Sequence, residues 1–172
     1  MKINSVLGPI DVESLGSTLI HEHLGIGWTG WELDHQDFDR KKACDKAVDK
    51  LKELRDLGIT SFVDPCPMEL GRDPEFAAEV SEKSGIQIVI ATGLYNDALG
   101  IPPHFRLMDI DGIAEHYVSE IEEGIGKTGI KPGIIKTAIG GIHGITEAGR
   151  GIQESEIKCL RAAARASNAT ST

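Results

Sequence analysis

The sequence has no excess of basic charge. It contains 18 Lys and Arg residues against 27 Asp and Glu residues, which gives a formal net charge of −9 over 172 residues. A protein that binds nucleic acid usually carries a basic patch, and the sequence has no stripe of Lys and Arg. A polybasic contact with a membrane is disfavoured for the same reason. We therefore expect neither nucleic acid nor a membrane as a partner.

Long apolar runs are missing as well. No run approaches the roughly 18–20 residues that are needed to cross a bilayer. Residues 1–16 contain neither a long apolar core nor a small-residue cleavage site of the kind found in signal peptides. We therefore expect a cytoplasmic protein.

Cysteine is scarce, and two common catalytic motifs are missing. Cys44, Cys66 and Cys159 are odd in number and widely spaced, which fits neither a disulfide framework nor a CxxC metal site. We expect reduced, buried thiols. The sequence contains no GxSxG elbow and no P-loop, so a serine-hydrolase site and a P-loop phosphate site are not supported.

The sequence does contain a repeated unit of a short apolar strand, a polar loop and an amphipathic helix. We expect strands at 18–23, 59–64, 86–91 and 133–137, and helices at about 40–57, 73–85, from 111 onward, and 154–166. This alternation predicts an α/β fold with right-handed βαβ units and a parallel sheet. Gly8-Pro9 between two short β-prone runs predicts a hairpin within residues 1–17. The first helix is expected to bury Ala43, Ala47, Leu51, Leu54 and Leu57.

His21 and His23 end the first predicted strand. Because side chains alternate along a strand, the two imidazoles should share one face and could bind one metal ion or flank two. The alternative is a pair of histidines that are satisfied in the core or at its rim. Their position favours the metal site, since parallel α/β folds place their sites at the carboxyl ends of strands.

Lys136 ends the fourth predicted strand, within an apolar run. A buried ammonium is costly unless it is paired or chemically changed, although the side chain could also extend to solvent at the rim. Trp28, Trp31 and Tyr95 lie on loops that follow strands, where they could line a pocket or pack a loop. The other histidines are expected in a solvated loop (His143) or at the surface (His35, His104 and His116).

Five segments in order along the chain resemble the phosphotriesterase-like family of the amidohydrolase superfamily. They are Gly16–Leu24; Val63–Pro65 with Gly71–Asp73; Ala91–Tyr95; Ile134–Lys136; and Leu160–Ala164. The resemblance implies a TIM-type (β/α)8 barrel with two divalent metal ions at its mouth, zinc or else Mn, Co or Fe.

The same resemblance assigns roles to individual residues. His21 and His23 would bind the more buried metal ion, and Lys136 would bridge the two ions after CO2 converts its amine to a carbamate. The metals would turn a bridging water into a hydroxide nucleophile that cleaves a phosphotriester, lactone or carboxylester. Tyr95 would face the substrate, and Trp28 is the second residue expected to line its pocket.

The sequence departs from the family in its length. A full barrel has eight units and about 250 residues, whereas four units are found here. We therefore expect residues 18–172 to be the first half of a barrel, truncated before strand five. Two further histidines and the proton-shuttling aspartate of the family would lie in the other half, so no catalytic residue is assigned here. An open half-barrel is expected to form a homo-oligomer or to be completed by a second polypeptide. The alternative function is that of a non-catalytic remnant.

Overall fold

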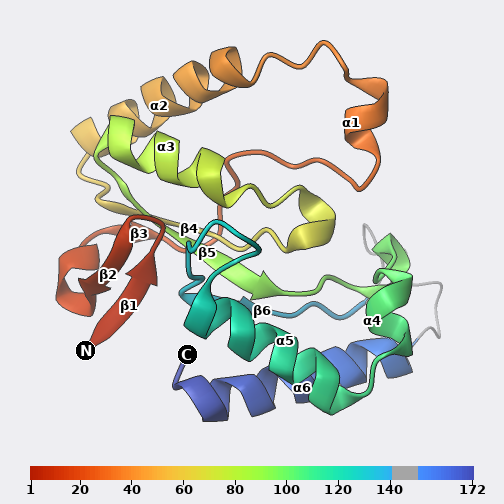
Figure 1. The fold of residues 1–172 in the computed structure, drawn as a ribbon. Coiled ribbons are helices and arrows are strands. Elements are labelled where there is room, and N and C mark those ends of the chain that lie inside the picture. The colour runs from red at the N-terminus through yellow and green to blue at the C-terminus, as the bar shows by residue number, and fades with distance from the viewer. Residues whose placement is uncertain (141–150) are drawn as a thin grey trace.

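The computed structural model describes residues 1–140 and 151–172 and shows a mixed α/β fold (Figure 1). β1 (Lys2–Ser5) and β2 (Gly8–Asp11) form an antiparallel hairpin, as predicted. Within the described residues, four parallel strands form the sheet in the order β3 (Thr18–Leu19), β4 (Ser61–Asp64), β5 (Gln87–Gly93) and β6 (Ile134–Lys136). The α/β class and the parallel sheet are confirmed, and the arrangement is compatible with part of a TIM-type barrel.

Helices connect the strands. The α-helices are α1 (Trp31–Asp34), α2 (Arg40–Asp56), α3 (Pro74–Ser84), α4 (Pro103–Leu107), α5 (Ile110–Glu123) and α6 (Glu154–Thr170), and the 3-10 helices are η1 (Val12–Leu15), η2 (Met68–Leu70) and η3 (Asp97–Leu99). Aspartate side chains cap the amino ends of α2, α3 and α5 by accepting a backbone hydrogen bond, which is a strong helix-start signal. No helix of the described chain is both long and apolar enough to cross a membrane.

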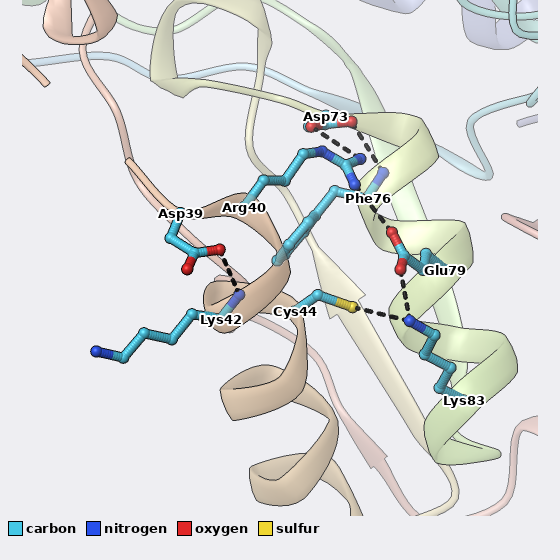
Figure 2. A network of polar contacts seen from close by, with 8 residues as sticks. All are labelled: Asp39, Arg40, Lys42, Cys44, Asp73, Phe76, Glu79 and Lys83. Atoms are coloured by element: carbon cyan, nitrogen blue, oxygen red, sulfur yellow. Dashed lines mark hydrogen bonds and ion pairs between the residues drawn. The ribbon is translucent and has the colours of Figure 1, made fainter. Parts of the chain in front are cut away.

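Helices α2 and α3 pack side by side through polar as well as apolar contacts (Figure 2). Glu79 of α3 accepts hydrogen bonds from Arg40 at 2.9 Å and from Lys83 at 2.5 Å. The predicted face of α2 is confirmed in most positions: Leu51 is buried, and Ala47 and Leu54 are partly buried against the same core as Cys44 and Val48. Leu57 is the exception, because it lies beyond the last helical residue and is 81% exposed.

Three predicted boundaries are wrong. The first strand ends at Leu19 rather than at His23, because only Thr18 and Leu19 pair with β4. The loop predicted at 92–109 contains the short helices η3 and α4. Pro103 is the first residue of α4, a position that proline favours. The last helix continues to Thr170 and takes up most of the tail that was expected after Ala166.

The sheet has helices against one face. Ile88 and Ile90 of β5 belong to the core cluster that contains the buried residues of α2 and α3. Thr92 lies two residues further on the same face, and its hydroxyl donates to Glu120 of α5 at 2.6 Å. Helices α2, α3 and α5 therefore cover the same face of the strands, as helices do on the outside of a barrel. In Figure 1 the pair α2 and α3 lies above the strands and the pair α5 and α6 lies below them.

The hairpin is held at the amino ends of the parallel strands. The backbone N–H of Val6 donates to the carbonyl of Ile88 at 2.8 Å, and the Asn4 amide donates to the carbonyl of Pro132 at 3.2 Å. Ile88 is near the start of β5, and Pro132 comes just before β6. The hairpin thus lies at the amino ends of the strands. The predicted site residues lie at the opposite, carboxyl ends.

Candidate metal centre

The carboxyl ends of the strands bring the predicted site residues to one edge of the sheet. Lys136 is the last residue of β6 and Asp64 is the last residue of β4. The chain stays beside β4 after β3 has ended, because the backbone N–H of Glu22 donates to the carbonyl of Val63 at 3.1 Å. This bond holds His21 and His23 next to the end of β4.

The two histidines contact each other. Their ring centroids lie 5.3 Å apart, and the rings meet edge to face. Since both residues follow β3, strand alternation is not the reason for their contact, and that part of the prediction is wrong. The His21 residue is exposed, whereas the His23 side chain is only 24% exposed.

His23 also meets two residues that the sequence did not indicate. Its Nδ1 lies 3.2 Å from Asp64 Oδ1 and 3.0 Å from Cys66 Sγ. One nitrogen, oxygen or sulfur atom from each of these three residues lies within 4.8 Å of the others, so they could hold a metal ion. The available signal was positional, since Asp64 and Cys66 end or follow the strand next to the histidines.

Cys66 is a buried thiol beside His23. Burial raises the pKa of the Cys66 thiol, the neighbouring Asp64 carboxylate raises it further, and the charge of Lys136 opposes the rise. Cys66 is 3% exposed, and Cys44 and Cys159 are also buried and free, as predicted. The thiol thus belongs to the same cluster as His23 and Asp64.

Lys136 is partly buried and lies near an aromatic ring. Its Nζ is 5.4 Å from the centroid of the Tyr95 ring. Burial lowers the pKa of Lys136, which favours the neutral amine. No carboxylate in the described residues forms an ion pair with Lys136, and its amine instead faces the Tyr95 ring in a cation–π geometry.

Glu69 positions Tyr95. Its Oε1 accepts a hydrogen bond from the backbone N–H of Tyr95 at 3.1 Å. Glu69 is 4% exposed, and burial raises the pKa of its carboxyl group. The segment after β4 thereby fixes the backbone of the turn after β5. This turn carries the Tyr95 ring that lies near Lys136.

Trp28, the other residue predicted to contact substrate, has no contact with this centre among the interactions of the described residues. Trp28 is 47% exposed, and its assignment to a substrate pocket stays a prediction. A cavity of about 460 Å³ does border Asp64 and Cys66, but its aromatic lining comes from Trp31, Phe38 and Phe76.

The other histidines have mixed outcomes. His35 and His104 are exposed, as predicted. The surface assignment of His116 is wrong, because it is partly buried on α5, next to Phe105 and 3.4 Å from a carboxylate oxygen of Glu120. His143 lies outside the described residues.

The chain matches a model of the phosphotriesterase family over residues 1–172. It belongs to the phosphotriesterase family. It is 36% identical over 148 residues to a phosphotriesterase homology protein of Mycobacterium tuberculosis, covering 80% of this chain and 44% of that protein. It is 33% identical over 168 residues to an aryldialkylphosphatase of Saccharolobus solfataricus, covering 94% of this chain and 49% of that enzyme.

A third relative has a different named activity. The chain is 31% identical over 176 residues to a phospho-furanose lactonase of Mycoplasmopsis agalactiae, covering 98% of this chain and 49% of that protein. The chain spans about half the length of these curated relatives. The named hydrolases support membership of a family of ester hydrolases.

Proposed function

We propose that this phosphotriesterase-family chain supplies the histidine pair and the bridging lysine of a metal-dependent hydrolase that cleaves ester bonds. One observation carries the proposal. His21 and His23 contact each other at the carboxyl end of the sheet, where Lys136 is the last residue of β6, and the Cys66 thiol contacts His23. The carboxyl ends of the strands are where α/β barrels place their active sites, which supports the proposal.

The chemistry of these groups fits two divalent metal ions. Neutral imidazoles bind Zn, Mn, Co or Fe, so His21 and His23 would hold the more buried ion. Lys136 would bridge both ions as a carbamate, because an ammonium cannot bind a cation. When bound, the metals would acidify water and polarise the scissile P=O or C=O bond. Tyr95 and Trp28 would contact the substrate, a small lactone, carboxylester or phosphotriester.

The rest of the site would come from another polypeptide segment or a second copy of the chain. In the described residues, β6 pairs with β5 along one edge and with no strand along the other. An unpaired edge favours association with a further strand. Light scattering coupled to size exclusion should therefore show an oligomer, and a compact monomer with a cooperative unfolding transition would contradict this part of the proposal.

The experiment for the site is a metal-binding measurement on the full chain. Zn2+ or Co2+ is titrated in the presence of bicarbonate, and the bound metal is counted for the parent chain and for His21→Ala and Lys136→Ala. We expect both variants to lose metal, and we expect the parent chain to bind less metal when bicarbonate is omitted. His35→Ala and Lys131→Ala are matched controls, because both residues are exposed and neither is a proposed ligand. Equal metal content in all five proteins would refute the ligand assignment.

A further inference from the structure

We infer that Asp64 is a positioning residue for His23, holding the imidazole in the tautomer that carries its proton on Nδ1 and leaves Nε2 free for a metal ion. This inference rests on the proposed function only for the metal. The contact between Asp64 and His23 is itself a property of the described chain, with Nδ1 lying 3.2 Å from Oδ1.

Two backbone hydrogen bonds fix the Asp64 carboxylate independently of His23. The Asp64 side chain is 10% exposed. Oδ2 accepts a hydrogen bond from the backbone N–H of Leu24 at 3.2 Å, and Oδ1 accepts one from the backbone N–H of Cys66 at 3.0 Å. These two bonds tie the loop after β3 to the loop after β4. The carboxylate therefore presents Oδ1 to His23 from a rigid position.

The chemistry of an ionised carboxylate decides the tautomer. It can only accept hydrogen bonds, so the imidazole nitrogen that faces it must carry the hydrogen. A neutral imidazole has one N–H, and Nε2 is then left with its lone pair. Metal-binding histidines commonly donate their second nitrogen to a carboxylate in this way, which fixes the ring and increases its basicity. Asp64 lies where it can do this for His23.

The thiol of Cys66 offers a competing arrangement. Sγ lies 3.0 Å from the same Nδ1, so a metal ion could instead be held by Nδ1, Sγ and Oδ1 together. The contacts favour the hydrogen-bonded arrangement, because Oδ1 already accepts a hydrogen bond from the Cys66 backbone N–H. Sγ also lies 3.6 Å from the Gly25 carbonyl, which can accept its S–H.

The first test is the tautomer itself, measured on the metal-free chain. Long-range 15N–1H NMR spectra of chain labelled at histidine, recorded about two pH units above the ordinary histidine pKa of about 6.5, distinguish the two tautomers. A His23→Gln spectrum assigns the signal. We expect the Nδ1–H form in the parent chain and in Cys66→Ala, and a shift toward the Nε2–H form in Asp64→Asn. A parent His23 in the Nε2–H form, or a shift in Cys66→Ala in place of Asp64→Asn, would overturn the inference.

The second test is metal affinity. Loss of a hydrogen-bonding partner behind a metal-binding histidine weakens binding by about 10- to 100-fold. We expect a loss of this size for Asp64→Asn. Asp109→Asn is the matched control, because Asp109 also accepts a backbone N–H, from Gly112 at 2.8 Å, but caps α5 away from the site. An unchanged affinity in Asp64→Asn would overturn the inference. If the parent chain binds no metal, the proposed function fails, while the NMR experiment still decides the Asp64–His23 contact.

Cobalt separates the two arrangements of the metal. Co2+ bound through Cys66 would produce a sulfur-to-cobalt charge-transfer band in the near ultraviolet, and the band would vanish in Cys66→Ala. We expect no such band, with Co2+ bound equally well by the parent chain and Cys66→Ala. A band that depends on Cys66 would show that Nδ1 and the thiol bind the metal, and would refute the positioning role of Asp64.

Discussion

Arg72 and Glu120 form a bidentate ion pair in the interior of the protein. Arg72 Nη1 and Nη2 lie 2.8 and 2.7 Å from the two carboxylate oxygens of Glu120, and the side chains are only 6% and 7% exposed. Arg72 also donates to the carbonyl of Ala91 at 2.9 Å, and Thr92 donates to Glu120. The pair thus joins the loop after β4 to β5 and α5, close to the carboxyl ends that carry the site.

Replacing Arg72 with methionine should destabilise the chain strongly. Glu120 would remain buried without its partner, and removing one member of a buried ion pair typically costs about 3–5 kcal/mol. Urea unfolding of Arg72→Met measures the loss. Arg165→Met is the control, because Arg165 pairs with Asp111 at the surface, where such pairs contribute at most about 1 kcal/mol. Equal losses in the two variants would contradict the structural role of the interior pair.

The same pair should make the fold sensitive to acid. Burial alone would raise the pKa of Glu120, but the nearby His116 ring and the hydrogen bonds from Arg72 and Thr92 outweigh it and lower the pKa to about 2. Because this lies below the unfolded value of about 4.3, the contribution to stability is complete above that pH and is lost as the pH falls toward 2. Urea midpoints between pH 7 and pH 3 should decline, and the decline should be smaller in an Arg72→Met/Glu120→Gln double variant. An identical decline in both proteins would exclude Glu120 as a cause.

Replacing Gly93 with alanine should disturb both the sheet and the lysine of the site. Gly93 pairs with Lys136 and has a φ of +118°, and a Cβ there would overlap the carbonyl of Lys136. We expect the free energy of unfolding to fall by about 2–4 kcal/mol, which combines the backbone cost of a positive φ with overpacking. Gly100→Ala is the matched control, since Gly100 also has a positive φ of +89° but a Cβ there would meet no atom within 4 Å. Its free energy of unfolding in urea should fall by about 1–2 kcal/mol.

The three cysteines should resist modification until the chain unfolds. Cys44, Cys66 and Cys159 are 1–3% exposed, and burial raises the pKa of each thiol. A thiol reagent such as Ellman's reagent should therefore react slowly in buffer and with all three cysteines in urea. Rapid reaction of one thiol in buffer, traced by mass spectrometry, would show that its surroundings open readily in solution.

Local signals in the sequence determined most of the elements. Asp73-Pro74 and Gly85 mark the two ends of α3, where Asp73 accepts a hydrogen bond from the backbone of Phe76 and Gly85 adopts a positive φ. Ile113, Tyr117 and Ile121 are all buried on α5, as their helical spacing predicts. These features depend on residues close together in the chain, and for that reason they can be predicted without the fold.

The sequence by itself determined the alternation of strands and helices, the resemblance to the family, and the positions of His21, His23 and Lys136 near strand ends. Only the tertiary structure decided that β3 ends before the histidines, that Leu57 is exposed, and that Asp64 and Cys66 meet His23. The physical reason is that backbone propensities and hydrophobic periodicity act over a few residues. The contacts of His23 join residues more than 40 positions apart, which only the pairing of neighbouring parallel strands brings together.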